Sequence, residues 1–438
     1  MRVLLAGKRS ESLRTCRDAY TILLYYAAVS AIVYAEMSLR HIRGGRMLKR
    51  RIKIFLYQLY RMAVRRTIPG LLIFESNLGR NYSGNPRAIY EEVLRRGWDK
   101  EMQICWLFTE PDKQAVPGNV TLLQRESLPA LLKMHRAVVW VTDTRQPTYI
   151  VKNPNTYYMM TWHGTPLKKL ALDLYDYTEA RMRQDAETAQ EPGEDGWEKR
   201  LERQRKQWLR DSAQWDCLLA QNETAEELFR GCFWYQGDVL CEGYPRNDAL
   251  VRFAENTEHE KRTILYAPTW REYESNGLCD SRFEPPLDFD RLFEVLKEEN
   301  TELIIKYHYY VKEKPDFSKY GGIIRDSEED IAALYPACDM LITDYSSTMF
   351  DYAVLKRPMV FFAYDRERYE RENGFYFDYE KLVPGPVVRT QEELFSVLRR
   401  GFDFAAYEEK QKTFYERFAA NDRGVAAAEA VERIAQHL

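Results

Sequence analysis

The sequence predicts an α/β protein built from two domains that face each other across a cleft. The chain has 438 residues, which is too long for one typical core at about 150 residues per domain. From Leu71 onward, short apolar runs alternate with amphipathic stretches, and a second series of the same kind starts at Thr263. Such alternation is typical of an open parallel sheet with helices on both faces.

The first series opens with the apolar run Leu71–Glu75, which we expect to be a strand. A helix is expected to begin near Asn85 and Pro86, because proline fits well in a first helical turn. A charged segment, Glu179–Arg210, interrupts the series and is predicted to form a solvated helical hairpin. The further predicted strands of this half are Ile104–Phe108, Val138–Val141, Tyr157–Thr161 and Cys217–Ala220.

The second series follows the polar stretch Glu255–Arg262, which is predicted to link the two domains. Its apolar runs are again short and separated by helical patterns, as expected for a second parallel sheet. The predicted strands are Ile264–Ala267, Leu303–Lys306, Ile323–Ile324, Met340–Thr343 and Met359–Phe362, and the predicted helices are Asp290–Glu299 and Ile331–Ala337.

The composition excludes several classes of protein. The formal net charge of -3 argues against nucleic-acid binding, which usually requires a strongly basic domain. The seven cysteines are odd in number and scattered without a CxxC pattern, and the histidines show no HExxH. We therefore expect no disulfide framework and no metal site, and a reducing compartment fits best.

The amino-terminal region is apolar and then strongly basic. Ala19–Ala35 carries no charge but falls just short of the roughly 20 residues that a membrane-spanning helix needs. Arg40–Arg66 then holds ten basic residues and no acidic one. Apolar residues recur in it at helical spacing, which predicts a helix lying on an anionic membrane surface. They are Ile52, Phe55, Leu56, Leu59 and Ala63.

Two alternatives for this region stay open. One is a pair of core-packing helices whose basic side is solvated. The other is a true membrane span or a signal sequence, with Val33–Ala35 as a cleavage site.

The strand at Tyr157–Thr161 runs directly into Trp162, His163, Gly164, Thr165 and Pro166. This places His163 at the carboxyl edge of a sheet, where open α/β folds bind ligands. Gly164 permits a close backbone approach, Pro166 suits the first turn of a following helix, and Thr165 is expected to cap it. The helix start, with Lys168 and Lys169 nearby, would favour an anion. The alternative is a buried histidine bonded to the backbone.

Polar residues also follow the strands of the second half. Ser346 and Ser347 stand at a predicted helix start and offer donors to a phosphate. Asp351, one turn further on, suits ribose or glycerol hydroxyls. Each of these, like Pro268–Arg271 and Lys306–His308, has an alternative as a simple cap or turn, but all fall on one sheet edge.

Arg246 closes the first half within the segment Gly243–Asp248. An arginine that faces the cleft is suited to holding a phosphate with two parallel hydrogen bonds. The alternative is a structural turn in which Arg246 pairs with Asp248.

These segments together resemble the CDP-glycerol glycerophosphotransferases, the teichoic acid primases and polymerases of Gram-positive bacteria. The resemblance covers about Leu71 to the carboxyl terminus, with the motifs in the family's order. They are WHGTPLKKL at 162–170, GYPRND at 243–248, APTWR at 267–271, Lys306 and His308, TDYSSTMFDYAVLKRP at 343–358, and NDRG at 421–424.

The resemblance implies a GT-B architecture of two Rossmann-like domains with the active site between them. It implies a membrane-associating segment at residues 1–66, an acceptor domain at 67–254 and a CDP-donor domain at 255–438. His163 would be the general base, and His308 and Arg246 would stabilise the pyrophosphate as CMP leaves. The residues implied to contact CDP-glycerol are His163, Gly164, Thr165, Pro166, Leu167, Arg246, Pro268, Thr269, Lys306, Tyr307, His308, Ser346, Ser347 and Asp351.

The implied reaction transfers glycerol phosphate from CDP-glycerol to a hydroxyl of a membrane-linked acceptor, without a cofactor or metal. The acceptor would be a polyprenyl diphosphate glycan or poly(glycerol phosphate), and the enzyme would be peripheral on the cytoplasmic face of the cell membrane. No nucleic-acid partner is expected, and a homo-oligomer stays open.

Several functional alternatives remain at this point. The donor could be CDP-ribitol or a sugar nucleotide, because the fold does not fix it. The chain could also be an inactive membrane-surface adaptor that keeps the fold. Whether it adds one unit or polymerises, and which acceptor it uses, is open. The charged segment Glu179–Arg210 is not expected to carry chemistry. It is longer than the family pattern leads us to expect, which leaves acceptor recognition open.

Overall fold

The computed structural model describes residues 46–188, 197–254, 261–271, 281–282, 285–308, 311–399 and 401–438. The predicted apolar segment Ala19–Ala35 lies outside these residues, as do Cys16 and Cys279. Of the predicted linker Glu255–Arg262, only Lys261 and Arg262 are described, and Arg262 already belongs to a strand.

The first half contains a seven-stranded sheet in the order β3-β2-β1-β4-β5-β6-β7. All of its strand pairs are parallel, as the sequence predicts. The central strands are continuous apolar runs because both of their faces are buried. The strands are β1 (Ile68–Glu75), β2 (Gln103–Phe108), β3 (Thr121–Gln124), β4 (Ala137–Thr142), β5 (Tyr157–Met160), β6 (Cys217–Leu219) and β7 (Asp238–Leu240).

The second half contains a six-stranded sheet in the order β12-β10-β8-β13-β14-β15, also with parallel pairs only. A separate two-stranded ribbon pairs β9 with β11. The strands are β8 (Arg262–Ala267), β9 (Ser281–Arg282), β10 (Thr301–Ile305), β11 (Val311–Glu313), β12 (Ile324–Asp326), β13 (Met340–Thr343), β14 (Met359–Phe362) and β15 (Val387–Val388).

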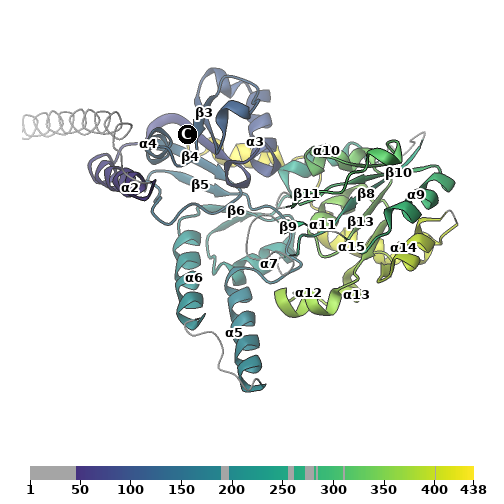
Figure 1. The fold of residues 1–438 in the computed structure, drawn as a ribbon. Coiled ribbons are helices and arrows are strands. Elements are labelled where there is room, and N and C mark those ends of the chain that lie inside the picture. Colours follow the sequence, from purple (N-terminus) through teal and green to yellow (C-terminus); the bar gives the residue numbers. More distant parts are fainter. Residues whose placement is uncertain are drawn as a thin grey trace, which may run out of the picture.

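Helices cover both faces of each sheet, and the two sheets lie in separate halves of the molecule (Figure 1). Each sheet therefore has two apolar cores, one per face. The helices of the first half are α2 (Arg46–Ala63), α3 (Gly84–Arg95), α4 (Leu128–Arg136), α5 (Ala171–Thr188), α6 (Trp197–Ser212), α7 (Glu223–Cys232) and α8 (Asp248–Val251). Those that follow are α9 (Phe289–Glu298), α10 (Ile331–Leu334), α11 (Thr348–Tyr352), α12 (Arg366–Asn373), α13 (Tyr379–Leu382), α14 (Gln391–Leu398), α15 (Glu408–Phe418) and α16 (Ala426–Ala435).

The predicted helical hairpin is confirmed and projects away from the first sheet as α5 and α6 (Figure 1). Arg205 of α6 bonds both Asp176 and Glu179 of α5, each at 2.6 Å. At its base, α5 contacts the second half, because the Tyr177 hydroxyl donates to the carbonyl of Arg371 at 3.0 Å. The hairpin is therefore anchored to both halves.

Helix α2 forms as predicted, but its apolar face is divided differently. The buried side consists of Tyr57 and Tyr60, followed by Val64 just beyond the end of the helix, and it lies against the first half near α4. Phe55 and Leu59, predicted on the same face as Leu56, are instead exposed at 61% and 43%. The tyrosine rings provide the buried surface, so this second apolar stripe remains on the outside. No helix of the described residues is long and apolar enough to cross a membrane.

The last helix returns to the first half of the molecule. Ala430, Val431 and Ile434 of α16 belong to the same core as Ile89 and Tyr90 of α3. In Figure 1 the yellow carboxy-terminal helix lies beside α3. The chain thus crosses from the first sheet to the second and back again.

Candidate active site

A cavity of about 970 Å³ opens between the two halves. Lys168 and Arg181 line it from the first half, and the second half contributes the loops after β8 and β10 together with α12. Thr269 and His308, both predicted site residues, are among the lining residues. The predicted cleft between two α/β halves is therefore present.

His163 follows β5 and is an exposed residue at the domain boundary. Its Nδ1 lies 2.9 Å from the backbone carbonyl oxygen of Asp143. A carbonyl only accepts hydrogen bonds, so Nδ1 carries the proton and Nε2 keeps its lone pair. Surrounding protein atoms and the nearby Arg246 guanidinium lower the pKa of His163, while the Asp143 carbonyl opposes this. The ring is thus a neutral base at neutral pH.

Trp162 determines how the chain turns at His163, in the segment after β5 called here the histidine loop. Its φ is +50°, a left-handed conformation that a bulky residue rarely adopts. The Trp162 side chain is buried against Phe233, with ring centroids 4.8 Å apart, and its ring stacks on that of His163 at 4.2 Å. Asn85 of α3 donates to the Trp162 carbonyl at 3.2 Å, which fixes the turn from the other side.

At Gly164 the first half comes close to the loop of the second half that contains Ser346 and Ser347, called here the serine loop. A Cβ built on Gly164 would lie 2.8 Å from the Ser347 hydroxyl oxygen, so only glycine fits without a shift. Ser346 and Ser347 immediately precede α11, as predicted, and Ser346 accepts from the backbone N–H of Thr348 at 3.3 Å. The structure therefore brings the predicted histidine and serine motifs together.

The segment after Gly164 corrects one prediction, because no helix starts at Pro166 and Thr165 caps none. Helix α5 begins only at Ala171. Instead, Leu167 is buried in the core of the second half, and its carbonyl accepts from the N–H of Tyr376 at 3.0 Å. The backbone groups that a helix would use are thus committed to an interdomain contact. The Thr165 hydroxyl is buried and donates to Gln221 at 2.7 Å.

Lys168, the next residue after Leu167, also contacts the second half. It forms an isolated β-bridge with Phe375, and its ammonium group donates to the Tyr369 hydroxyl at 2.9 Å. Its side chain lines the cavity. The charge of Lys168 is therefore directed towards the second half.

Arg246 pairs with Asp351, at 2.9 and 2.8 Å from Nη2 to the two carboxylate oxygens. Both side chains are almost fully buried, with 12% and 7% exposed. The sequence alternative in which Arg246 pairs with Asp248 is wrong, because Asp248 accepts the backbone N–H groups of Ala426 and Ala427 at the start of α16. Asp351 is thus the counter-ion of Arg246, and the pair joins the two halves.

The loop after β8 is held by a buried carboxylate, Asp344. The backbone N–H of Thr269 donates to Asp344 at 2.9 Å, and the Thr269 hydroxyl donates to the same oxygen at 2.5 Å. Arg271, which is fully buried, lies 2.9 Å from Asp344 and 2.7 Å from Asp365. Pro268 and Thr269 therefore have a rigid position next to the serine loop.

Lys306, Tyr307 and His308 follow β10, as predicted. Tyr307 is buried in the core, whereas His308 lies at the cavity with its ring near that of Trp270. Burial and the positive charges of Lys168 and Arg80 lower the pKa of His308 to about 4. His308 is therefore neutral at neutral pH, and its ring carries an N–H but no charge. Burial also lowers the pKa of Lys306.

The sequence analysis missed three residues that hold the candidate site in place, which are Asp143, Asn85 and, as the anchor of Thr269, Asp344. Asp143 directly follows β4, so the strand-end rule that selected His163 would have selected it too. Burial raises the pKa of the Asp143 carboxyl to about 7. Asn85 gave no signal beyond its place at a helix start.

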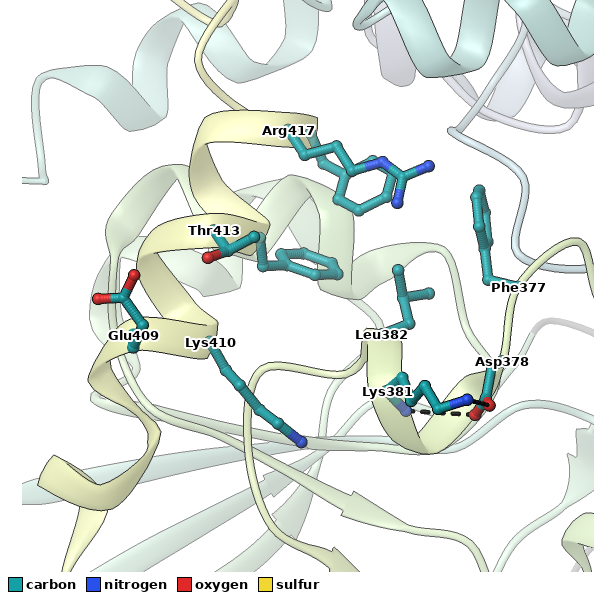
Figure 2. A pocket seen from close by; sticks show the side chains of 10 residues that line it. Phe377, Asp378, Lys381, Leu382, Glu409, Lys410, Thr413 and Arg417 are labelled. Atoms are coloured by element: carbon teal, nitrogen blue, oxygen red, sulfur yellow. Dashed lines mark hydrogen bonds and ion pairs between the residues drawn. The ribbon is translucent and has the colours of Figure 1, made fainter.

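A smaller cavity of about 370 Å³ lies between α13 and α15 (Figure 2). It is lined by Phe377, Leu382 and Phe414 and carries Lys381, which is paired with Asp378 at 2.7 Å. No predicted site residue lines it. Among the described residues, no group of three or more His, Cys, Asp or Glu is placed to hold a metal ion.

A family model described as CDP-Glycerol:Poly(glycerophosphate) glycerophosphotransferase matches residues 58–436. The chain is 36% identical over 381 residues to the teichoic acid poly(glycerol phosphate) polymerase of Bacillus spizizenii, which covers 83% of this chain and 91% of that protein. It is 33% identical over 398 residues to the teichoic acid glycerol-phosphate transferase of Staphylococcus aureus, covering 87% and 96%. The chain is also 34% identical to a teichoic acid poly(glycerol phosphate) polymerase of Staphylococcus epidermidis. It spans about half of that protein's length, 49%.

Solved structures show the same similarity. The wall teichoic acid polymerase TagF superposes with a TM-score of 0.76 at 32% identity, over 92% of this chain and 98% of that one. A variant of TagF that was soaked with CDPG superposes with the same TM-score at 31% identity. The similarity thus extends over both halves of the chain.

Proposed function

The chain belongs to the CDP-glycerol:poly(glycerophosphate) glycerophosphotransferase family, and on this premise we propose that it transfers glycerol phosphate from CDP-glycerol to a hydroxyl of a membrane-linked acceptor. CMP is the second product, and the reaction serves the synthesis of teichoic acid or a related cell-surface polymer. Relatives named as glycerol phosphate polymerases and transferases support the donor and the reaction. The observation that carries the proposal is His163, which is bonded through Nδ1 to the Asp143 carbonyl and directly precedes Gly164, the residue that meets Ser347.

The proposed reaction is a displacement at the phosphorus atom that carries glycerol. An acceptor hydroxyl loses its proton to Nε2 of His163, and its oxygen forms a bond to this phosphorus. The bond between the phosphorus and the bridging oxygen of the pyrophosphate breaks, and CMP leaves with the electron pair. A neutral histidine suits this role, because a general base works best when its pKa lies close to the working pH.

Positive charge and N–H donors are needed on the pyrophosphate, where negative charge accumulates as CMP leaves. We assign this role to Arg246 and to the N–H of His308. The other proposed contacts to CDP-glycerol are Gly164, Thr165, Pro166, Leu167, Pro268, Thr269, Lys306, Tyr307, Ser346, Ser347 and Asp351. The buried side chains of Thr165, Leu167 and Tyr307 would act mainly through their backbone groups.

We propose that the two halves bind different substrates. We propose that residues 67–254 provide the acceptor side with His163, and that residues 255–438 hold the CDP-linked donor. Support comes from the positions of the loops, since Thr269 and His308 both line the cavity from the second half.

We also propose that α2 holds the enzyme on the cytoplasmic face of the membrane as a peripheral protein. Its exposed side combines Phe55 and Leu59 with basic residues such as Arg51. An exposed apolar stripe flanked by arginine and lysine is the combination that favours a surface of anionic lipids. A lipid-linked acceptor would then be presented at the same surface.

The test is a panel of donors supplied to the purified chain with a lipid-linked disaccharide that carries one glycerol phosphate. CDP-glycerol, CDP-ribitol and a UDP-sugar are compared by the release of CMP or UDP. The proposal predicts CMP release from CDP-glycerol, dependent on acceptor, at a rate well above that with the other two donors. A preference for CDP-ribitol would reassign the donor, and no release with any donor would favour an inactive adaptor.

A further inference from the structure

Arg145 has an unusual setting in the first half of the molecule. Its guanidinium carbon lies 3.6 Å from the centroid of the Trp208 ring, and the side chain is half-buried. Within the described residues, no hydrogen bond or ion pair reaches this guanidinium, and Asp211 and Tyr175 act on it only through their charges. An arginine has five N–H donors in a fixed fork. In Arg145 none of these donors is hydrogen-bonded to a described residue.

The nearest acidic group does not supply the missing partner. Asp211 of α6 is buried and interacts with Arg145 only at a distance, while its Oδ2 has no hydrogen-bond partner among the described residues. Burial raises the pKa of Asp211 to about 7, so this carboxyl is partly protonated at neutral pH. Trp208 is fixed by a 3.0 Å hydrogen bond from its indole N–H to the hydroxyl of Tyr175 on α5. The hairpin therefore places a fixed indole ring against a guanidinium that has no hydrogen-bonded acidic partner among the described residues.

Two independent observations place Arg145 close to His163, the proposed base. It is two residues after Asp143, whose carbonyl binds Nδ1 of His163, and two residues of chain span at most about 7 Å. Through the side chains, the Trp208 ring lies 6.2 Å from that of Trp162, which stacks on His163 at 4.2 Å. Arg145 is thus on the first-half side of His163, whereas His308 and Thr269 line the cavity from the other half.

We propose that Arg145, supported by Trp208, forms an acceptor subsite that binds a phosphate group of the acceptor. The planar guanidinium fork matches two phosphate oxygens, and such charge-assisted pairs are the strongest hydrogen bonds available to a side chain. Bound there, the acceptor places its terminal hydroxyl near Nε2 of His163. This inference rests on the proposed transferase function and adds to it how the acceptor is held and why the hairpin is present.

The phosphate has two chemical sources in the proposed acceptors. One is the diphosphate that joins a glycan to its lipid, and the other is a phosphodiester of a glycerol phosphate chain. Two acceptors separate them: a lipid-diphosphate disaccharide without glycerol phosphate, and a short water-soluble oligo(glycerol phosphate) without lipid or diphosphate.

The experiment measures CMP release by the full chain with each acceptor, for the wild type, Arg145→Gln and Arg145→Lys. A lost pair of charged hydrogen bonds weakens binding by about tenfold or more, so the acceptor KM should rise by at least that factor in Arg145→Gln. Arg145→Lys keeps the charge but loses the fork, and we expect a smaller rise. The KM for CDP-glycerol should not change. The acceptor whose KM rises identifies the phosphate that is bound.

Arg203→Gln is the matched control, since Arg203 is an exposed arginine on the same helix as Trp208. It removes one positive charge from the hairpin beneath Arg145 and should leave both KM values unchanged. A general charge effect would instead change the acceptor KM in both variants and would overturn the proposal. An Arg145→Gln variant with unchanged acceptor KM in both arms, or with a raised KM for CDP-glycerol only, would also overturn it.

Calorimetric titration of each acceptor in the absence of donor separates this inference from the transferase proposal. If the wild type releases no CMP, the transferase proposal fails, while the subsite is still tested by direct binding. Binding of either acceptor to the wild type that is lost in Arg145→Gln supports the subsite. No binding to the wild type, or equal binding to both proteins, contradicts it.

Discussion

His163 is held in place by main-chain rather than side-chain chemistry. Its Nδ1 proton is committed to the carbonyl of Asp143 at 2.9 Å, and its ring is stacked on Trp162, whose backbone is left-handed. This arrangement fixes both the tautomer and the orientation of the ring without placing a carboxylate next to it. No carboxylate is bonded to the ring at this contact. The surrounding protein atoms and the charge of Arg246 therefore outweigh the opposing effect of the Asp143 carbonyl, and the pKa of His163 is lowered.

The pH dependence of the reaction should reflect this lowered pKa. A general base acts when unprotonated, so kcat/KM should decline on the acid side with an apparent pKa below the ordinary histidine value of about 6.5. Activity should therefore persist at pH 6.5 and fall only at more acidic pH. The measurement is a pH profile of kcat/KM for CMP release, and an acid limb above pH 7 would contradict the assignment.

Gly164 should not tolerate a side chain, even one methyl group. In Gly164→Ala the new Cβ would meet the Ser347 hydroxyl at 2.8 Å, so the histidine and serine loops must move apart. Because small displacements of reacting groups are costly, we expect a loss of about 100-fold in kcat with little change in the thermal midpoint of unfolding. Gly231→Ala is the control, since a Cβ there meets no atom within 4 Å; equal activity of the two variants would refute the close-approach argument.

At the residue level, the sequence predicted the positions of candidate site residues that directly follow a strand. His163, Thr269, His308 and Ser347 all follow parallel strands, and parallel strands end at a common edge. Thr165 was misjudged because its hydroxyl serves Gln221, a residue far away in sequence. Contacts of this kind depend on tertiary packing and leave no local pattern.

At the level of elements, α2 and the α5–α6 hairpin extend the first half beyond its sheet. The inner face of α2 is bonded to the loop that follows β4, since Gln58 donates to the carbonyl of Tyr149 at 3.0 Å. The same loop carries Asp143 and Arg145, and α6 supplies the ring beneath Arg145. A helix proposed to lie on the membrane is therefore connected, through one loop, to the proposed base and acceptor subsite.

The exposed stripe of α2 should determine membrane binding. Replacing Phe55 and Leu59 by serine removes two exposed apolar side chains, each worth about 1.5–3 kcal/mol when fully buried. We expect binding to vesicles of phosphatidylglycerol to weaken by at least about tenfold, measured by sedimentation, with CMP release from a water-soluble acceptor unchanged. Undiminished binding of the double variant would contradict the proposed role, as would equal binding of the wild type to neutral vesicles.

The elements themselves were predicted unevenly. Long apolar runs such as β1 and β13 were found, because a strand buried on both faces is almost uniformly apolar. The outer strands β3 and β7 were missed because they are short and partly exposed. The start of α5 was placed too early, since the residues before it are bound to the second half.

On the scale of the whole molecule, a buried polar network joins the two halves behind the active site. Asp422, in the closing NDRG motif, accepts from the backbone N–H of Tyr244 and from Gln221, both at 2.8 Å, and from Asn247 at 3.2 Å. Asn247 in turn donates to Asp351, the counter-ion of Arg246, at 3.2 Å. The network thus supports the Arg246–Asp351 pair from behind and gives the closing motif a structural role.

Removing Asp422 should destabilise the folded protein more than its size suggests. In Asp422→Ala three buried N–H donors lose their acceptor, and each unsatisfied buried donor costs about 1–3 kcal/mol. We expect the free energy of unfolding to fall by roughly 2–4 kcal/mol in urea denaturation. Asp112→Ala, at an exposed carboxylate, should change it little; similar values for both variants would contradict a stabilising role for the interdomain network.

The two-domain arrangement was predictable from the alternation of strands and helices, but the joints between the halves were not. Arg246 and Asp351 are 105 residues apart in the sequence, and Arg246 had a plausible local partner in Asp248. The return of α16 to the first half was equally hidden, because an amphipathic helix shows which face is buried but not against what.

The most direct test of the proposed mechanism is the rate of CMP release from CDP-glycerol with a lipid-linked acceptor, for the wild type and His163→Asn. Asparagine keeps a polar group of similar reach but has no basic nitrogen to take the acceptor proton. The mechanism predicts acceptor-dependent CMP release by the wild type, a loss of at least about 100-fold in kcat for His163→Asn, and unchanged binding of CDP-glycerol by calorimetry. A His163→Asn variant that releases CMP at the wild-type rate would contradict the central claim.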